Sequence, residues 1–176
     1  ERPPLSGSVS VGDSVNVGDH RQGNDGLPDA GTVLEAMQQV RNIPPADERD
    51  YLARFLFHGD DIFDDVSTLS GGERTRLRVA RLMATGPNFL VLDEPTTHLD
   101  IPSQEALEEA LLDYGGTLLL VSHNRHLISV LAKQLLIIED GAARLFEGSF
   151  EEWSRKADPV APAPQASATR QAPSRR

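Results

Sequence analysis

The apolar residues near the start of the chain alternate with polar ones. This alternation covers residues 8–17, on both sides of a Gly12-Asp13 turn, and it predicts a β-hairpin. Further along, three runs of four apolar residues show no alternation, which is typical of strands covered on both faces. These runs lie at 89–92, 118–121 and 135–138.

Helical spacing of apolar residues marks the segments around these strands. Thr32 is a suitable N-cap for a helix that begins at Val33 and continues through Val40, with Glu35 as the capping-box acid. The other helices that the spacing predicts cover about 45–57, 73–84, 102–114 and 125–133.

The order of the later elements predicts the class of fold. Strand, helix, strand, helix and strand follow one another over residues 89–138, which is the pattern of right-handed parallel crossovers. An Asp140-Gly141 turn then predicts that residues 143–146 fold back as an antiparallel hairpin. We therefore expect an α/β fold with a mainly parallel sheet, flanking helices and an antiparallel hairpin.

Two segments carry candidate chemistry for binding a phosphate. Ser70-Gly71-Gly72 opens the helix at 73–84, and the unpaired N–H groups and positive dipole end of a helix start suit an anion. Asp93 and Glu94 follow the first apolar run, and acids there face the crevice in which open parallel sheets bind ligands. The plainer alternatives are a simple helix cap and a polar loop start.

Four motifs occur in the order and spacing of one family. LSGGE at 69–73 resembles the signature of ATP-binding-cassette (ABC) ATPases, and FLVLDEP at 89–95 resembles their Walker B strand. His98-Leu99-Asp100 resembles the D-loop, and VSHNRHL at 121–127 resembles the switch-histidine segment. TLSGGERTRLRVARLM, TTHLD and LFEGSFEEW are most similar to the ABC-F group, soluble proteins with two cassettes in one chain. The resemblance implies a partial P-loop NTPase-like cassette.

The resemblance also implies ATP and Mg²⁺ as ligands and gives roles to single residues. Asp93 would hold Mg²⁺, Glu94 would be the general base on the attacking water, and His123 would contact the γ-phosphate. Gln22 would sense Mg²⁺ and that water. The residues that would serve a second ATP, held by the opposite cassette, are Ser70, Gly71, Gly72, Glu73 and Asp100.

The P-loop of these ATPases is missing from the sequence. The motif G-x-x-x-x-G-K-[ST] requires a Gly-Lys pair, and the only lysines, Lys133 and Lys156, follow Ala132 and Arg155. The chain also begins at Glu1 in mid-pattern. We interpret it as the C-terminal part of a second cassette, which completes no ATP site alone and is expected to be inactive by itself.

The expected organisation is a partial cassette followed by a tail. The cassette covers 1–156 and comprises a β-hairpin with the Q-loop at 1–26, a helical subdomain with the signature at 27–85, and the Walker B region with the C-terminal hairpin at 86–156. Residues 157–176 are rich in Ala, Pro, Ser, Gln and Arg without periodicity, which predicts a disordered tail or a linker.

Composition narrows the class of protein. The 176 residues carry a net charge of −10, which argues against broad, non-specific binding of nucleic acid. The chain has no cysteine, so disulfides and thiolate metal sites are excluded. No apolar run approaches the ~18 residues of a membrane helix, and no signal-peptide pattern opens the chain. We therefore expect a cytoplasmic location.

Two charged segments leave alternatives open. The acidic loop at 58–65 suits either a solvated loop or a metal site, although it lacks EF-hand spacing. Arg74, Arg78 and Arg81 share one stripe of their helix. That stripe suits either a solvated face with acidic partners or a contact with RNA or a partner cassette.

Two residues depart from the ABC-F pattern. Thr97 stands where the family usually has Asn, and Asn124 stands where Asp usually follows the switch histidine. Both side chains can still form hydrogen bonds, so the departures affect positioning rather than the base or the metal ligand.

The resemblance implies a cycle in which ATP closes two cassettes and hydrolysis reopens them. In ABC-F proteins this cycle would act on the ribosome, with rRNA or tRNA as a contact, in translation control or antibiotic protection. Two alternatives stay open at this point: the nucleotide-binding subunit of an ABC transporter, and a non-catalytic binding module.

Overall fold

We describe the fold from a computed structural model of the chain. The structure describes residue 4 and residues 6–20, 26–41 and 44–157. The chain divides into two compact units, one that ends at Leu131 and one that begins at Ala132, and each is considered by itself. No helix in the described ranges is long and apolar enough to cross a membrane.

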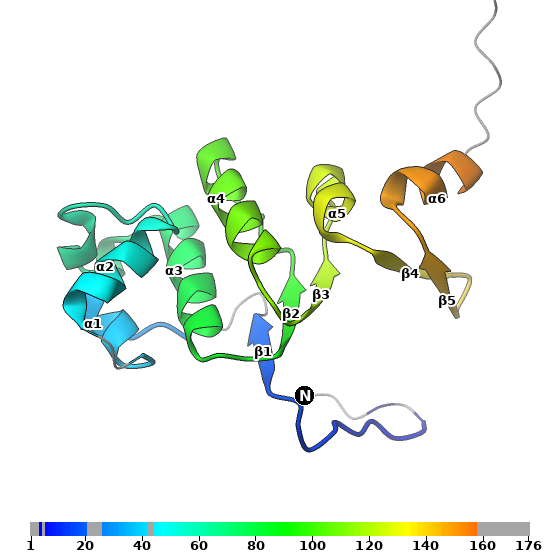
Figure 1. The fold of residues 1–176 in the computed structure, drawn as a ribbon, viewed down its shortest axis with the longest axis horizontal. Helices are drawn as coiled ribbons and strands as arrows, with labels where there is room; N and C mark the ends of the chain where they lie inside the picture. Colours follow the sequence, from blue (N-terminus) through cyan, green and yellow to red (C-terminus); the bar gives the residue numbers. More distant parts are fainter. Residues whose placement is uncertain (1–3, 5, 21–25, 42–43, 158–176) are drawn as a thin grey trace, which may run out of the picture. The chain divides into compact units, whose positions relative to one another are not determined.

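The first unit is built on a parallel three-stranded sheet (Figure 1). Its strands are β1 (Val17–His20), β2 (Phe89–Asp93) and β3 (Thr117–Val121), in the order β1-β2-β3. Helix α4 (Ile101–Leu112) connects β2 to β3. The predicted strand-helix-strand crossover is therefore confirmed for the first two apolar runs.

Asn88 joins the starts of the three strands. Its side chain accepts a hydrogen bond from the Asn16 N–H at 2.8 Å and donates to the Ser14 carbonyl at 2.9 Å. Its backbone N–H donates to the Asn16 carbonyl at 3.0 Å, and its carbonyl accepts from the Thr117 N–H at 2.9 Å. These bonds help to set the register in which the opposite ends of the strands meet.

The β-hairpin predicted over residues 8–17 is wrong. Residues 8–16 contain no strand, although a turn forms at the predicted place. Val17 begins β1 instead, and β1 pairs parallel with β2. Val9 is 81% exposed, and an isolated two-stranded hairpin with no apolar surface to pack on is only marginally stable.

A group of helices over residues 32–84, here called the helical group, precedes β2. Thr32 caps its first helix through the predicted capping box with Glu35. Its last helix contacts β1 and α4 as well as the first helix, so it links the group to the sheet (Figure 1). The elements in order are α1 (Val33–Gln38), α2 (Pro45–Ala53), the short 3₁₀ turns η1 (Asp61–Phe63) and η2 (Val66–Thr68), and α3 (Gly71–Ala84).

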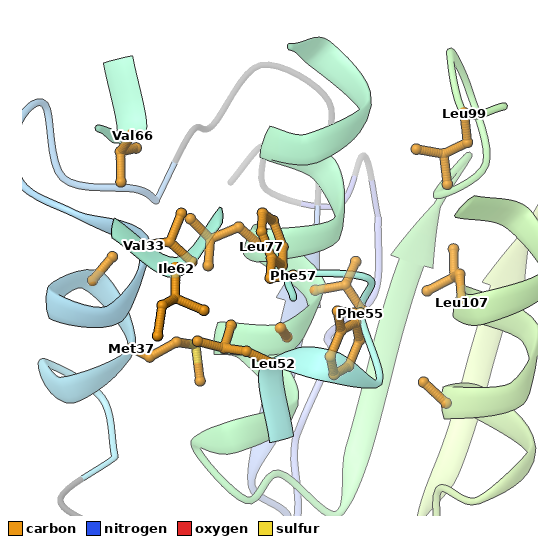
Figure 2. Packing of buried hydrophobic residues seen from close by; sticks show 14 of the residues in the cluster. Val33, Met37, Leu52, Phe55, Phe57, Ile62, Val66, Leu77, Leu99 and Leu107 are labelled. Atoms are coloured by element: carbon orange, nitrogen blue, oxygen red, sulfur yellow. The ribbon is translucent and has the colours of Figure 1, made fainter. Parts of the chain in front are cut away.

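One apolar core holds the helical group together (Figure 2). Burying one side chain of the size of leucine adds about 1.5–3 kcal/mol to the free energy of unfolding. Helix α2 ends at Ala53, before the predicted end at Phe57, and Leu56 has a left-handed φ of 60°. Phe57 is buried beyond this turn. The labelled core residues of the helical group are Val33, Met37, Leu52, Phe55, Phe57, Ile62, Val66 and Leu77.

Helices α4 and α5 (Arg125–Leu131) contact each other beside the sheet. The predicted inward face of α4 is confirmed, since Ala106, Leu107, Ala110 and Leu111 are buried. The prediction that every apolar run is covered on both faces is wrong for β3, where Leu119 is 42% exposed and Val121 is 53% exposed. In the described part of the chain β3 is an edge strand, so its side chains have neighbours on fewer sides.

The second unit is a hairpin followed by a helix. Strand β4 (Gln134–Glu139) pairs antiparallel with β5 (Ala142–Glu147) across the predicted Asp140-Gly141 turn. Both turn residues have positive φ, as a type I′ turn requires. The prediction of a third parallel strand at 135–138 is wrong, because β4 pairs with β5 in a separate sheet of the described residues. Helix α6 (Phe150–Ala157) follows.

Glu48 is an ionisable side chain buried in the helical group. Its exposed fraction is 0%, and neither carboxylate oxygen has a hydrogen-bond partner in the described part of the chain. Burial raises the pKa of Glu48, and Arg41 opposes this shift in part. The carboxyl therefore stabilises the fold most below its ordinary pKa of 4.5, and that contribution is lost as the pH rises through the raised pKa.

We expect Glu48→Gln to raise the free energy of unfolding at pH 7 by roughly 1 kcal/mol, because it removes a buried charge. The gain should shrink as the pH is lowered towards 4.5, where the wild-type carboxyl is itself mostly neutral. Urea denaturation at the two pH values measures both effects. Asp50→Asn, at an exposed position of the same helix, is the control. An equal gain at both pH values would show that ionisation is not the cause.

Candidate functional site

Two acidic residues stand at the carboxyl end of the central strand. Asp93 is the last residue of β2 and is exposed, and Glu94 follows directly. Asp93 is in register with Val121, the last residue of β3. Because the strands are parallel, the loops that leave them emerge at the same edge of the sheet.

Glu94 has an uncommon backbone conformation. Its φ is 48°, in the left-handed region that non-glycine residues rarely adopt. The Glu94 N–H donates to the Val121 carbonyl at 2.8 Å, and the Glu94 carbonyl accepts from the Thr97 N–H at 3.2 Å. Conformations of this kind cost on the order of 1–3 kcal/mol and cluster at functional sites, which makes this turn a candidate site.

The Glu94 carboxylate lies next to His123, which follows β3. Its Oε1 atom is 3.8 Å from Nε2 of His123, and the two side chains are 19% and 99% exposed, respectively. Oε1 is buried and has no hydrogen-bond partner among the described residues. A buried carboxylate oxygen without a donor suits a proton acceptor, since a water molecule held there would supply the missing hydrogen bond.

The predicted signature residues open helix α3. Ser70 is the N-cap: its hydroxyl accepts from the Glu73 N–H, and the Glu73 carboxylate accepts from the Ser70 N–H at 2.8 Å. The hydrogen bond from the Ser70 hydroxyl is the main reason that the pKa of Glu73 is lowered. Ser70 and Gly71 are exposed, so the start of this helix is accessible to an anion.

The start of α3 lies against the predicted D-loop. A Cβ atom placed on Gly72 would be 3.6 Å from both the His98 carbonyl oxygen and Cδ2 of Leu99. Asp100 caps α4 by accepting from the Ser103 N–H at 3.1 Å, and its hydrogen bonds to Ser103 are the main cause of its lowered pKa. The structure thus brings the predicted residues together in two groups, one at 70–73 and 98–100 and one at 93–94 and 123.

Arg76 is a structural residue of this region that the sequence motifs do not single out. Its Nη1 donates to the carbonyls of Phe55 and Leu56 at 3.3 Å and 3.4 Å. Its guanidinium lies 5.2 Å from the ring centroid of Phe57, and Nη2 is 3.8 Å from the Glu73 carboxylate. Arg76 therefore ties the turn after α2 to the start of α3. The available signal was its spacing of three residues from Glu73 on one helix.

Two arginines of the α3 stripe form hydrogen bonds with main-chain carbonyl groups. Arg74 Nη1 donates to the Val66 carbonyl at 2.8 Å, and Arg81 Nη1 donates to the Gly26 carbonyl at 2.9 Å. Burial lowers the pKa of Arg81. The guanidinium groups of these two residues thus bind main-chain oxygens of neighbouring segments, and both side chains stay partly exposed.

The acidic loop at 58–65 supplies local caps. Asp61 accepts from the His58 N–H at 3.0 Å, and Asp65 accepts from the Ser67 N–H at 2.8 Å. The hydrogen bond from the Ser67 hydroxyl is the main cause of the lowered pKa of Asp65. No group of three His, Cys, Asp or Glu residues that could hold a metal ion occurs in the ranges that the structure describes.

The residues at the strand end fit Mg²⁺ and a bound water molecule. Proteins often hold Mg²⁺ through one or two carboxylates together with substrate phosphates and water, and Asp93 offers one exposed carboxylate at the strand end. Oε1 of Glu94 has no hydrogen-bond partner among the described residues, so it could accept a hydrogen bond from a water molecule near the metal ion. Gln22, the other predicted contact to Mg²⁺, lies outside the described residues.

Comparison with known proteins decides the family. The family model described as "ABC transporter" matches residues 10–97, which is half of the chain. The chain belongs to the ATP-binding cassette (ABC) family. The resemblance stated from the four motifs is thereby confirmed.

The similar curated proteins include members of the ABC-F group. The chain is 41% identical to YdiF of Bacillus subtilis over 154 residues, which are 87% of this chain and 24% of YdiF. It is 38% identical to the energy-dependent translational throttle protein EttA of Haemophilus influenzae over 165 residues, which are 89% of this chain and 30% of EttA. The chain thus spans about a quarter to a third of the length of these relatives.

Solved structures of ABC proteins share the fold. The archaeal ribosome recycling factor aABCE1, in complex with the ribosomal stalk protein aP1, has a TM-score of 0.67 at 22% identity and covers 89% of this chain and 32% of its own. The ATP-binding cassette MJ0796, in a dimeric post-hydrolysis state with ADP and phosphate, has a TM-score of 0.60 at 22% identity and covers 76% of this chain and 63% of its own. These likenesses confirm the predicted α/β cassette fold.

We expect Ser70→Ala to lower the free energy of unfolding by roughly 1 kcal/mol at neutral pH, since α3 loses its N-cap. The lowered pKa of Glu73 stabilises the fold above the ordinary value of 4.5, and this contribution is lost as the pH falls through the lowered pKa. The difference from wild type, measured by urea denaturation, should therefore shrink at acid pH. Ser70→Thr, which keeps a hydroxyl, is the matched control, and a difference independent of pH would contradict the link to Glu73.

Proposed function

We propose that the full-length gene product is an ABC-F-type ATPase that binds ATP with Mg²⁺ and hydrolyses it. The observation that carries this proposal is the Glu94 carboxylate, whose buried Oε1 lies 3.8 Å from His123 Nε2 and has no hydrogen-bond partner in the described ranges. Membership of the ABC family supports the choice of ATP as substrate.

Each strand-end residue has a proposed role in the reaction. Glu94 would accept a proton at Oε1 from the attacking water. His123, whose side chain is exposed, would donate a hydrogen bond to the γ-phosphate, which gathers charge on its oxygens during transfer. Asp93 would hold Mg²⁺, and bound Mg²⁺ would neutralise phosphate charge. Gln22 remains a predicted contact to Mg²⁺ and water.

The signature residues would act on a second ATP, held mainly by the opposite cassette. The exposed start of α3 at Ser70 and Gly71 supports this role, with Gly72, Glu73 and Asp100 as further proposed contacts. The sequence contains no P-loop motif, so residues 1–156 would contribute part of a cassette, and the phosphate cradle would come from another segment. We propose that the chain alone is inactive for this reason.

The proposed partner of the full-length protein is the ribosome. The support is the 38% identity to EttA, which is named a translational throttle protein. The cycle of cassette closure and opening would drive binding and release at rRNA or tRNA in the cytoplasm, in translation or in antibiotic protection.

In the full-length gene product, Glu94→Gln should lower kcat for ATP by about 10²–10⁴-fold, because the general base is lost while the shape of the side chain is kept. ATP binding should remain, so the variant should retain labelled ATP through gel filtration. Glu105→Gln, at an exposed position of α4, is the control. Turnover equal to that of the wild type would exclude Glu94 as the base.

The chain of residues 1–176 by itself should release no phosphate from ATP above the background without protein, because its sequence has no P-loop to cradle the phosphates. Phosphate release measured beside the full-length product tests this expectation. If the chain alone released phosphate, and if Glu94→Gln abolished that release, residues 1–176 would suffice for hydrolysis.

A further inference from the structure

A chain of side-chain hydrogen bonds crosses from the loop at 97–100 to the start of helix α5. Nε2 of Gln104 donates to the Leu99 carbonyl at 2.9 Å, and Nδ2 of Asn124 donates to Oε1 of Gln104 at 3.1 Å. The Asn124 Oδ1 then accepts from the Leu127 N–H at 3.1 Å. Gln104 lies on α4, so one glutamine joins two loops that leave different strands.

The residues at both ends of this chain of bonds are held firmly. Leu99 is 8% exposed, its N–H donates to the Thr96 carbonyl at 3.2 Å, and its Cδ2 lies where a Cβ atom added to Gly72, at the start of α3, would be 3.6 Å away. At the other end, the Asn124 N–H donates to the Ser122 hydroxyl at 3.0 Å. Leu99 is therefore connected through two hydrogen bonds to Asn124, the residue directly after His123.

The side-chain amides of Gln104 and Asn124 are complementary: the Asn124 amide donates a hydrogen bond, and the Gln104 amide oxygen accepts it. Gln104 uses its N–H group on Leu99 and its oxygen on Asn124, so the residue at 124 must donate. An aspartate there has no proton to donate at neutral pH. If Gln104 turned its N–H group towards that aspartate, the Leu99 carbonyl would lose this donor. Both amides are partly buried, so water competes less well for these bonds.

We propose that Gln104 and Asn124 form a positioning pair that couples the loop at 97–100, against the start of α3, to the placement of His123. The inference rests on the proposed ATPase function for its kinetic consequence. Its structural part stands by itself, because it concerns only contacts between described residues. Asn124, which departs from the ABC-F pattern, is in this view the matched partner of Gln104.

Hydrogen exchange of the full-length gene product without nucleotide tests the coupling itself. Gln104→Leu keeps the size of the side chain and removes both of its hydrogen bonds. We expect faster exchange in the loop at 97–100 and also at 122–127, with no change in the sheet. Glu105→Gln is the control on the next residue of α4. Faster exchange at 97–100 alone would overturn the proposal.

A double-mutant cycle on ATP turnover tests the kinetic consequence. Asn124→Asp alone should lower kcat about tenfold with little change in KM, and combining it with Gln104→Lys should restore most of the loss, because an ammonium group can donate to both Leu99 and the new carboxylate. If Gln104 and Asn124 only stabilised the fold, the losses of kcat from the two substitutions would add in the double variant. That result would overturn the proposal. If the wild type hydrolyses no ATP, the proposed function fails, whereas the exchange experiment still decides whether the pair couples the two loops.

Discussion

The hydrogen bond from the Glu94 N–H to the Val121 carbonyl fixes the edge of the sheet on which the candidate chemistry depends. It extends the pairing of β2 and β3 by one residue and holds Glu94 in a left-handed conformation. Because of that register, His123 leaves the neighbouring strand within 3.8 Å of the Glu94 carboxylate. At the other end of the sheet, Asn88 joins the starts of the strands, so the register is fixed at both ends.

A second constraint is that main-chain carbonyl groups in turns and loops need hydrogen-bond donors. Arg76 serves the carbonyls of Phe55 and Leu56, and Gln104 serves the carbonyl of Leu99. In each case a helix side chain holds a turn or a loop; Arg76 lies about twenty residues from its partners, and Gln104 lies five residues from Leu99. Loops held in this way keep a defined place beside a site, since an unpaired buried carbonyl would cost free energy.

The motifs and the helical periodicity predicted most of the first unit. The capping box at Thr32, the apolar face of α4 and the parallel pair of β2 and β3 were all readable from local spacing. The predictions of a hairpin over 8–17 and of a third parallel strand were wrong, because the pattern of apolar residues does not determine which neighbour a strand pairs with. Helix α6 went unpredicted, although the reciprocal bonds of Ser149 and Glu152 follow the same capping-box spacing as at Thr32.

The sequence by itself determined the family, the residue types at the candidate site and the places where the helices before α6 begin to within two residues, since motifs, caps and periodicity are local properties of the chain. Only the tertiary structure decided that Glu94 and His123 are neighbours, that Gly72 faces the loop at 98–99, and that Gln104 and Asn124 bond to each other. The physical reason is that each of these contacts depends on strand register and helix placement. Packing of segments far apart in the sequence sets both.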